Sequence, residues 1–235
     1  VANAITTEFG AIDYSKEQPK ADSLENSIEE IAVVDSEEFT LAKNEEKIVT
    51  ISVKTPPESY EGIKLGTVYF KRVDSDEEDS KNQIKSEYSY RIAIMLSETD
   101  NKYNNGQTLE LTNVKPELSR SKKSIILTLD NPEPKMIKDF EMTVKILDKN
   151  GKVLKVQSLE NGSIAPNTNF DYAFDWGIDT IKSGKYVAKI NATSTHKSWE
   201  LEKEFEITGK DAKEMNEKTL YKLFLPKWAY VMTIV

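Results

Sequence analysis

An alternation of apolar and polar residues recurs along the chain and is the feature that most constrains its fold. In one run, Phe140, Met142 and Val144 alternate with Glu141 and Thr143. The same pattern occupies further runs, at residues 86–96, 168–175, 185–193 and 198–207. Because a strand sends neighbouring side chains to opposite faces, each run predicts a strand with one buried and one solvated face. Such strands favour antiparallel pairing.

Turn-forming residues separate the runs. The segment 148–151, Asp-Lys-Asn-Gly, lies between two of them, and Asn-Gly supplies the positive φ that a tight hairpin needs. We expect eight strands in this part, at residues 86–96, 108–114, 123–129, 139–148, 152–158, 168–175, 185–193 and 198–207. Short strands at this spacing predict an immunoglobulin-like β-sandwich.

The first part of the chain has a different pattern. Leu24, Ile28 and Ile31 share one face at helical spacing, which predicts a short amphipathic helix, or at least a helical turn, with Asp22 or Ser23 as its N-cap. Strands are expected after it, at residues 38–41, 47–54 and 65–72, and half a strand at residues 1–5. We interpret this part as an incomplete β-domain.

An acidic stretch separates the two parts. Residues 74–82 hold no apolar side chain and a strong negative run, which predicts a solvated linker over 74–83. Carboxylate oxygens suit Ca²⁺, but the stretch lacks the glycine turn and the regular ligand alternation of a calcium loop. The solvated linker is therefore the favoured interpretation.

Composition excludes several classes of function. The chain has 235 residues, a net charge of −8 and no cysteine. Nucleic-acid binders concentrate Lys and Arg on one face, and no long basic cluster occurs here. Without cysteine there is no disulfide and no thiolate metal site.

Catalytic constellations are equally scarce. His196 is the one histidine, and no Gly-x-Ser-x-Gly segment supports it as a catalytic base. Asp171 and Asp175 flank aromatic positions close to Trp176, a layout that a sugar-binding or glycosidase cleft could use. Any half-exposed strand has the same layout, so we predict no catalytic, cofactor or metal residues. Trp176, beside a turn, is the one candidate for an exposed binding contact.

The last thirteen residues, 223–235, form an almost unbroken apolar run. A spanning helix needs roughly 20 apolar residues, so we expect the start of a truncated transmembrane helix. The amphipathic side chains that would lie at the membrane interface are Lys222, Lys227, Trp228 and Tyr230. The alternative is a terminal strand or helix packed on the core. The chain opens at Val1 without a leader, so we expect a fragment.

Several segments, in their order and spacing, are similar to those of a known family. They are residues 3–14, 62–70, 88–90, 164–172, 184–186, 199–205 and 211–216. Residues 62–70 resemble a Gly-x-x-Leu-Gly-Gly-Ile-x-Phe strand, with Thr67 in place of the second glycine. Residues 164–172 resemble a Met-Ala-Pro-Asn-x-x-Phe-x-Phe segment. Together these segments resemble the WxL-interacting proteins of Gram-positive bacteria.

The resemblance implies a full domain plan. It implies an all-β chain with two immunoglobulin-like sandwiches in tandem, the first truncated at its N-terminus. The expected parts are a partial peptidoglycan-binding domain at 1–73, the linker at 74–83, a host-binding sandwich at 84–208, a stalk at 209–222 and the start of the membrane span at 223–235. The implied location is the Gram-positive cell surface, with a single-pass membrane anchor.

The resemblance also implies a function without catalysis. The expected partners are peptidoglycan, WxL-domain surface proteins and host extracellular matrix, and no binding residues can be carried over. Two alternatives stay open. One is a carboxylate-dependent glycoside hydrolase that acts on peptidoglycan, and the other is a pilus-chaperone-like sandwich that donates strand edges to its partners.

Overall fold

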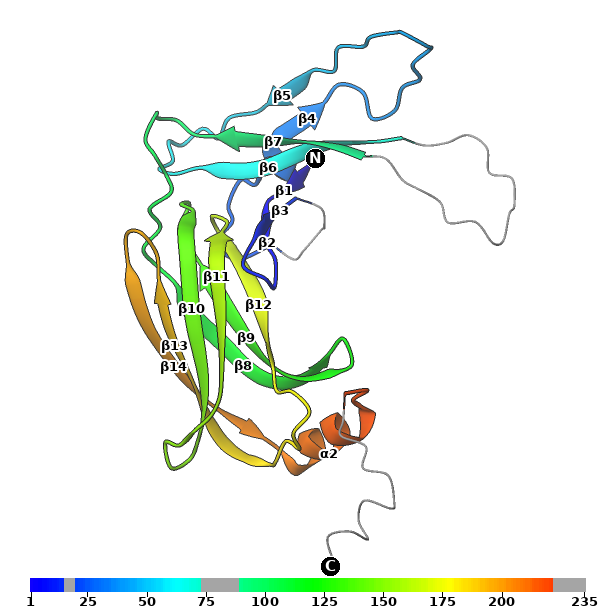
Figure 1. The fold of residues 1–235 in the computed structure, drawn as a ribbon. Coiled ribbons are helices and arrows are strands. Elements are labelled where there is room, and N and C mark those ends of the chain that lie inside the picture. The colour runs from blue at the N-terminus through cyan, green and yellow to red at the C-terminus, as the bar shows by residue number, and fades with distance from the viewer. Residues whose placement is uncertain (15–19, 73–88, 222–235) are drawn as a thin grey trace, which may run out of the picture.

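The computed structural model describes residues 1–14, 20–72 and 89–221, which form a predominantly β structure. Two sheets packed face to face make one part, and several smaller sheets lie at one end of it, at the top of Figure 1. The predicted linker at 74–83 and the predicted membrane segment at 223–235 lie outside the described residues.

The larger part is a β-sandwich. One sheet has the order β11-β10-β13-β14 and the other has the order β12-β9-β8, and all of their pairings are antiparallel. The strands are β8 (Glu110–Ser119), β9 (Lys122–Asn131), β10 (Ile137–Asp148), β11 (Val153–Ile164), β12 (Thr168–Asp175), β13 (Gly184–Thr193) and β14 (Ser198–Ile207). These strands confirm seven of the eight predicted from the alternation, with longer ends for several of them.

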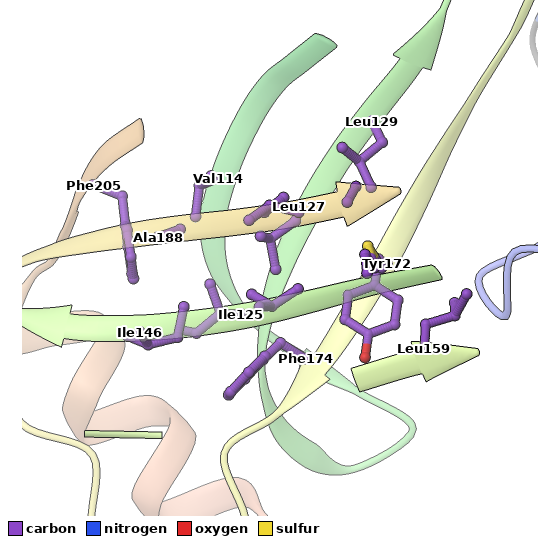
Figure 2. Close-up of a cluster of buried hydrophobic side chains, with 14 of the residues drawn as sticks. Val114, Ile125, Leu127, Leu129, Ile146, Leu159, Tyr172, Phe174, Ala188 and Phe205 are labelled. Carbon is purple, nitrogen blue, oxygen red and sulfur yellow. The ribbon is translucent and has the colours of Figure 1, made fainter. Parts of the chain in front are cut away.

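The sandwich core follows directly from the alternation. Phe140, Val144 and Ile146 on β10 are fully buried, as are Ile125 and Leu127 on β9. Figure 2 shows Ile146 of β10 beside Ile125 and Leu127 of β9 between the two sheets. Burial of each such side chain contributes about 1.5–3 kcal/mol, so this layer dominates the stability of the described fold.

The predicted hairpin at 148–151 is present. Gly151 has a φ of 79°, and the Asp148 carboxylate accepts hydrogen bonds from the Asn150 and Lys152 backbone amides at 2.8 and 3.0 Å. This turn joins β10 to β11 and sets their register.

The smaller part contains short strands and one short helix. Its main sheet has the order β1-β6-β7, and two hairpins, β2-β3 and β4-β5, lie beside it. The elements are β1 (Ala2–Asn3), β2 (Ile5–Thr6), β3 (Ile12–Asp13), α1 (Ile28–Ile31), β4 (Ala32–Val34), β5 (Ile51–Val53), β6 (Lys64–Lys71) and β7 (Ser89–Leu96). No strand forms at 38–41, contrary to expectation.

The strand expected at 86–96 forms as β7, but it joins a different sheet. It pairs with β6 from Lys64–Leu96 to Lys71–Ser89 without a register shift, rather than with the sandwich strands. The alternation identifies a strand and not its neighbour, so sequence reasoning could not assign β7 to a sheet.

The predicted helical turn in the first part is confirmed, with a different cap, and the expected stalk contains a packed helix. α1 is a single turn capped by Ser27, whose backbone amide donates to the Glu30 carboxylate at 2.9 Å, so the prediction of Asp22 or Ser23 as the cap was wrong. The expected stalk contains α2 (Gly209–Lys218), which packs on the end of the sandwich away from the smaller part (Figure 1). Its buried residues, Ala212 and Met215, belong to the sandwich core, which explains why this segment does not extend as a stalk.

Candidate binding surfaces

The outer edge of β7 is open. One side of the strand pairs with β6 along eight consecutive residues, and the other side has no strand partner within the described residues. Natural edge strands are usually short, bulged, or carry lysine or proline, which prevents pairing with another chain. β7 has no bulge or proline, and Arg91 is its one charged side chain.

Large apolar side chains stand exposed on the same strand. Tyr90 is 75%, Ile92 56% and Met95 60% exposed, with Tyr90 and Ile92 on one face and Met95 on the other. The surrounding part adds further exposed apolar residues: Val33, Phe39, Leu41, Ile48, Val53 and Tyr69. The expectation that one face of this strand is buried was wrong. We refer to β7 and its exposed side chains as the β7 edge.

The smaller part has too few packed residues to cover these side chains. Ile28 of α1 packs over Gly66 on β6, where an added Cβ would lie 2.8 Å from the Ile28 side chain and 2.5 Å from the Ala2 carbonyl oxygen. Val68, two residues further on the same face, is 2% exposed. α1 is a single turn, so its cover ends there. Ile92, the β7 partner of Val68, is 56% exposed, whereas Ile94, the partner of Gly66, is half-buried.

The two parts are joined by buried hydrogen bonds. The Thr6 hydroxyl lies 2.7 Å from the Thr168 hydroxyl and accepts from the Ala165 backbone amide at 3.0 Å. The Ser163 amide donates to the Gly10 carbonyl at 2.7 Å. These contacts fix the β2-β3 hairpin against the end of β11 and β12.

Trp176 does not form an exposed contact. Only 5% of its surface is accessible, and its ring meets Tyr186 edge-on with a centroid separation of 6.0 Å. Gly177 turns the chain directly after it with a φ of 79°, and Lys123 holds the following loop by donating to the Ile178 and Asp179 carbonyls. Proximity to a turn therefore suggested exposure, but the loop folds Trp176 into the sandwich core.

The carboxylates of the glycosidase alternative are engaged in structural contacts. Asp171 accepts from the Thr128 hydroxyl at 2.6 Å, and Asp175 pairs with Lys122 at 3.0 Å. Burial opposes ionisation of Asp175, but hydrogen bonds from the Gly177 amide and Lys122 outweigh it and lower its pKa. A general acid needs a raised pKa, so Asp175 is unsuited to that role.

One carboxyl group does have a raised pKa. Asp130 is half-buried, and desolvation, with the nearby charges of Glu110 and Asp22, raises its pKa. Across the residues that the structure describes, no cluster of acids or histidine has a metal-binding arrangement. His196 is exposed in the turn between β13 and β14, as expected for a loop histidine.

The predicted membrane-interface residues, Lys222, Lys227, Trp228 and Tyr230, lie outside the described residues. Neither of the described helices has the length and apolar character needed to cross a bilayer. The membrane anchor therefore stays a prediction.

Two family models match the chain. Residues 1–72 match the WxL Interacting Protein peptidoglycan binding domain, and residues 79–217 match the WxL Interacting Protein host binding domain. The chain belongs to the WxL-interacting protein family. By the bounds of these two matches, β6 lies in the peptidoglycan binding domain and β7 lies in the host binding domain. The β6–β7 pair therefore joins the two domains in one sheet.

Other comparisons add little to the family assignment. No curated protein matches the chain. Two crystal structures of Parabacteroides merdae β-glucuronidase, one with glycerol in its active site, are 16% and 17% identical to this chain. Each match covers 50% of this chain and 14% of the enzyme, with a TM-score of 0.26, too low to carry an argument about fold or activity.

Proposed function

We propose that this protein is a non-enzymatic scaffold on the surface of a Gram-positive cell, which binds peptidoglycan, WxL-domain partner proteins and host matrix. The descriptions of the two matched domains support this proposal. A tandem of immunoglobulin-like sandwiches and a single-pass anchor formed by residues 223–235 are parts of the same proposal, and the anchor rests on the sequence alone.

The β7 edge carries the part of the proposal that concerns WxL-domain partners. Unpaired amide and carbonyl groups along an edge strand are satisfied by another extended strand, and alternate apolar side chains then decide which strand fits. We infer that the partner adds a β-strand beside β7. Its apolar residues would cover Tyr90 and Ile92.

Charge adds a second requirement for the partner strand. Arg91 is exposed and has no ion-pair partner among the described residues. It lies on the face opposite Tyr90 and Ile92. A partner strand with an acidic residue beside Arg91 and apolar residues on the other face would match both faces of β7.

The test compares two exposed apolar residues of equal accessibility. Ile92 on β7 and Val156 on β11 are each 56% exposed. Binding of a companion WxL-domain protein to the full chain is measured by calorimetry for Ile92→Lys and Val156→Lys. We expect Ile92→Lys to weaken binding at least about tenfold, a loss of about 1.4 kcal/mol, and Val156→Lys to leave it unchanged. Equal affinities for both variants would contradict the β7 assignment.

Wall binding needs a separate assay. Purified sacculi are incubated with the protein and sedimented, and the supernatant is analysed for soluble muropeptides. The proposal predicts co-sedimentation without muropeptide release. Release would favour the hydrolase alternative, whereas tight partner binding without any wall affinity would favour the pilus-chaperone-like alternative.

A further inference from the structure

A polar hollow of about 400 Å³ lies where the two family-matched regions meet. Its lining residues are Glu61, Asn105, Gln107, Glu133, Pro134 and Lys135. Glu61 comes from the peptidoglycan-binding match, and the others come from the host-binding match. The volume falls within the range of about 300–1,000 Å³ typical of small-molecule sites.

Backbone contacts hold the walls of the hollow in place. The Ile63 amide donates to the Pro134 carbonyl at 2.9 Å, and an added Cβ on Gly62 would lie 2.4 Å from the same oxygen. The Gly106 amide donates to the Met136 carbonyl at 2.9 Å. Three chain segments are therefore fixed against one another before any ligand arrives, which lowers the cost of binding.

The lining offers hydrogen-bonding groups that have no partner. The side-chain amides of Asn105 and Gln107 make no hydrogen bond among the described residues, and Asn105 Oδ1 is buried without a donor. Glu133 is already engaged, since its carboxylate accepts from the Gln107 backbone amide and the Thr108 hydroxyl. Asn105 Oδ1 has no accessible surface, so the groups left to recognise a ligand are the Gln107 carboxamide, with both a donor and an acceptor, and Asn105 Nδ2 as a donor.

Charge and shape narrow the ligand class. Two carboxylates and one ammonium line the hollow, and Lys135 is paired with Glu61 at 3.2 Å, so the residual charge is negative. A carboxylated or sulfated sugar would be repelled. The lining has no aromatic or large aliphatic side chain, which disfavours an apolar ligand.

We propose that this hollow binds a neutral N-acetylated sugar unit of a glycan, with its acetamido group and hydroxyls bonded to Asn105 and Gln107. An acetamido group presents one N–H and one C=O, the complement of a side-chain carboxamide. The inference rests on the proposed wall- and matrix-binding function. Such units occur in both bacterial wall glycan and host matrix glycan, so the source is an outcome of the test.

The test is an NMR titration of the full chain with the trisaccharide of N-acetylglucosamine, with cellotriose as the sugar without acetamido groups. We expect amide shifts at residues 105–107 and 133–135 with the first sugar only. An Asn105→Ala, Gln107→Ala double variant should lose at least about tenfold in affinity. Asn191→Ala, which removes an exposed carboxamide on β13, should bind as the parent does. Equal shifts with cellotriose, or shifts elsewhere, would overturn the inference.

A second arm separates this inference from the proposed function and identifies the source of the glycan. The parent and the double variant are sedimented with bacterial sacculi and with beads carrying a matrix glycan. If the double variant loses only one of these interactions, the result would support sugar binding in the hollow and would identify which glycan it binds. If the double variant retains full sacculus binding and the parent shows no shifts with the trisaccharide, sugar binding in the hollow would be overturned. The wall-binding function would then remain intact.

Discussion

The sandwich and the smaller part share the same alternation of apolar and polar residues, but their apolar side chains differ in burial. Phe140 and Val144, on alternate positions of β10, are fully buried, whereas Tyr90 and Ile92, on alternate positions of β7, are mostly exposed. The difference lies in the second layer. β10 packs against another sheet, whereas the sheet that contains β7 is covered by α1, a single helical turn that packs on β1 and β6. Apolar alternation therefore marks a face that can be covered, and a second layer decides whether it is.

Their edges differ in the same way. β11, at one edge of the sandwich, carries Lys155 and pairs with β10 through several register shifts. Both features discourage pairing with another chain. Both edges expose apolar side chains, including Val156 on β11, but β7 has an unshifted register and no lysine, so the edge of the smaller part is open and this sandwich edge is guarded.

The largest expected contrast is between truncations at the two sites. Phe140→Ala removes a fully buried ring and should lower the free energy of unfolding by about 3–5 kcal/mol. Tyr90→Ala removes a side chain that is 75% exposed and should change it by no more than about 0.5 kcal/mol. Urea denaturation of both variants measures this, and similar losses would show that the β7 edge is covered in solution.

A smaller effect is expected where the smaller part is tightly packed. Gly66→Ala places a Cβ against the Ala2 carbonyl and Ile28 and should destabilise the protein by about 1–3 kcal/mol. Gly209→Ala, at the first position of α2, meets nothing within 4 Å and should be neutral or slightly stabilising. Thermal unfolding of the pair measures this, and a neutral Gly66→Ala would refute the close approach of α1.

The junction between the two parts offers a comparable test. Thr6→Val deprives the buried Ala165 amide of its acceptor and should cost about 1–3 kcal/mol. Thr6→Ser keeps the hydroxyl and should cost less. Native-state hydrogen exchange follows the β2-β3 hairpin in each variant, and equal protection in Thr6→Val and the parent would show that this contact does not hold the parts together.

The smallest effect concerns Asp130. Because its pKa is raised in the folded state, the contribution of this carboxyl to stability is present below its unfolded pKa of about 3.9 and is lost as the pH rises through the folded value. Asp130→Asn should therefore be more stable than the parent at pH 7, with the difference vanishing at low pH. Urea midpoints across this pH range measure it, and a less stable variant at pH 7 would contradict the desolvation of Asp130.

Local pattern predicted the sandwich strands well and the sites poorly, for physical reasons. The alternation and the Asn150-Gly151 turn are properties of neighbouring residues, and they identified the strands and a hairpin. The partner of β7, the burial of Trp176 and the packing of α2 depend on contacts between residues far apart in sequence. The polar hollow unites residues 61, 105 and 133, so no spacing in the sequence could have revealed it.

Hydrogen exchange of the β7 amides tests most directly the claim that β7 is an open edge for a partner strand. In an antiparallel pair, alternate amides of an edge strand bond to the neighbour and the others point outward. We predict that the outward amides of residues 89–96 exchange rapidly in the free protein and become protected when a companion WxL-domain protein is added. Protection of these amides before addition, or binding without any change in them, would contradict the account.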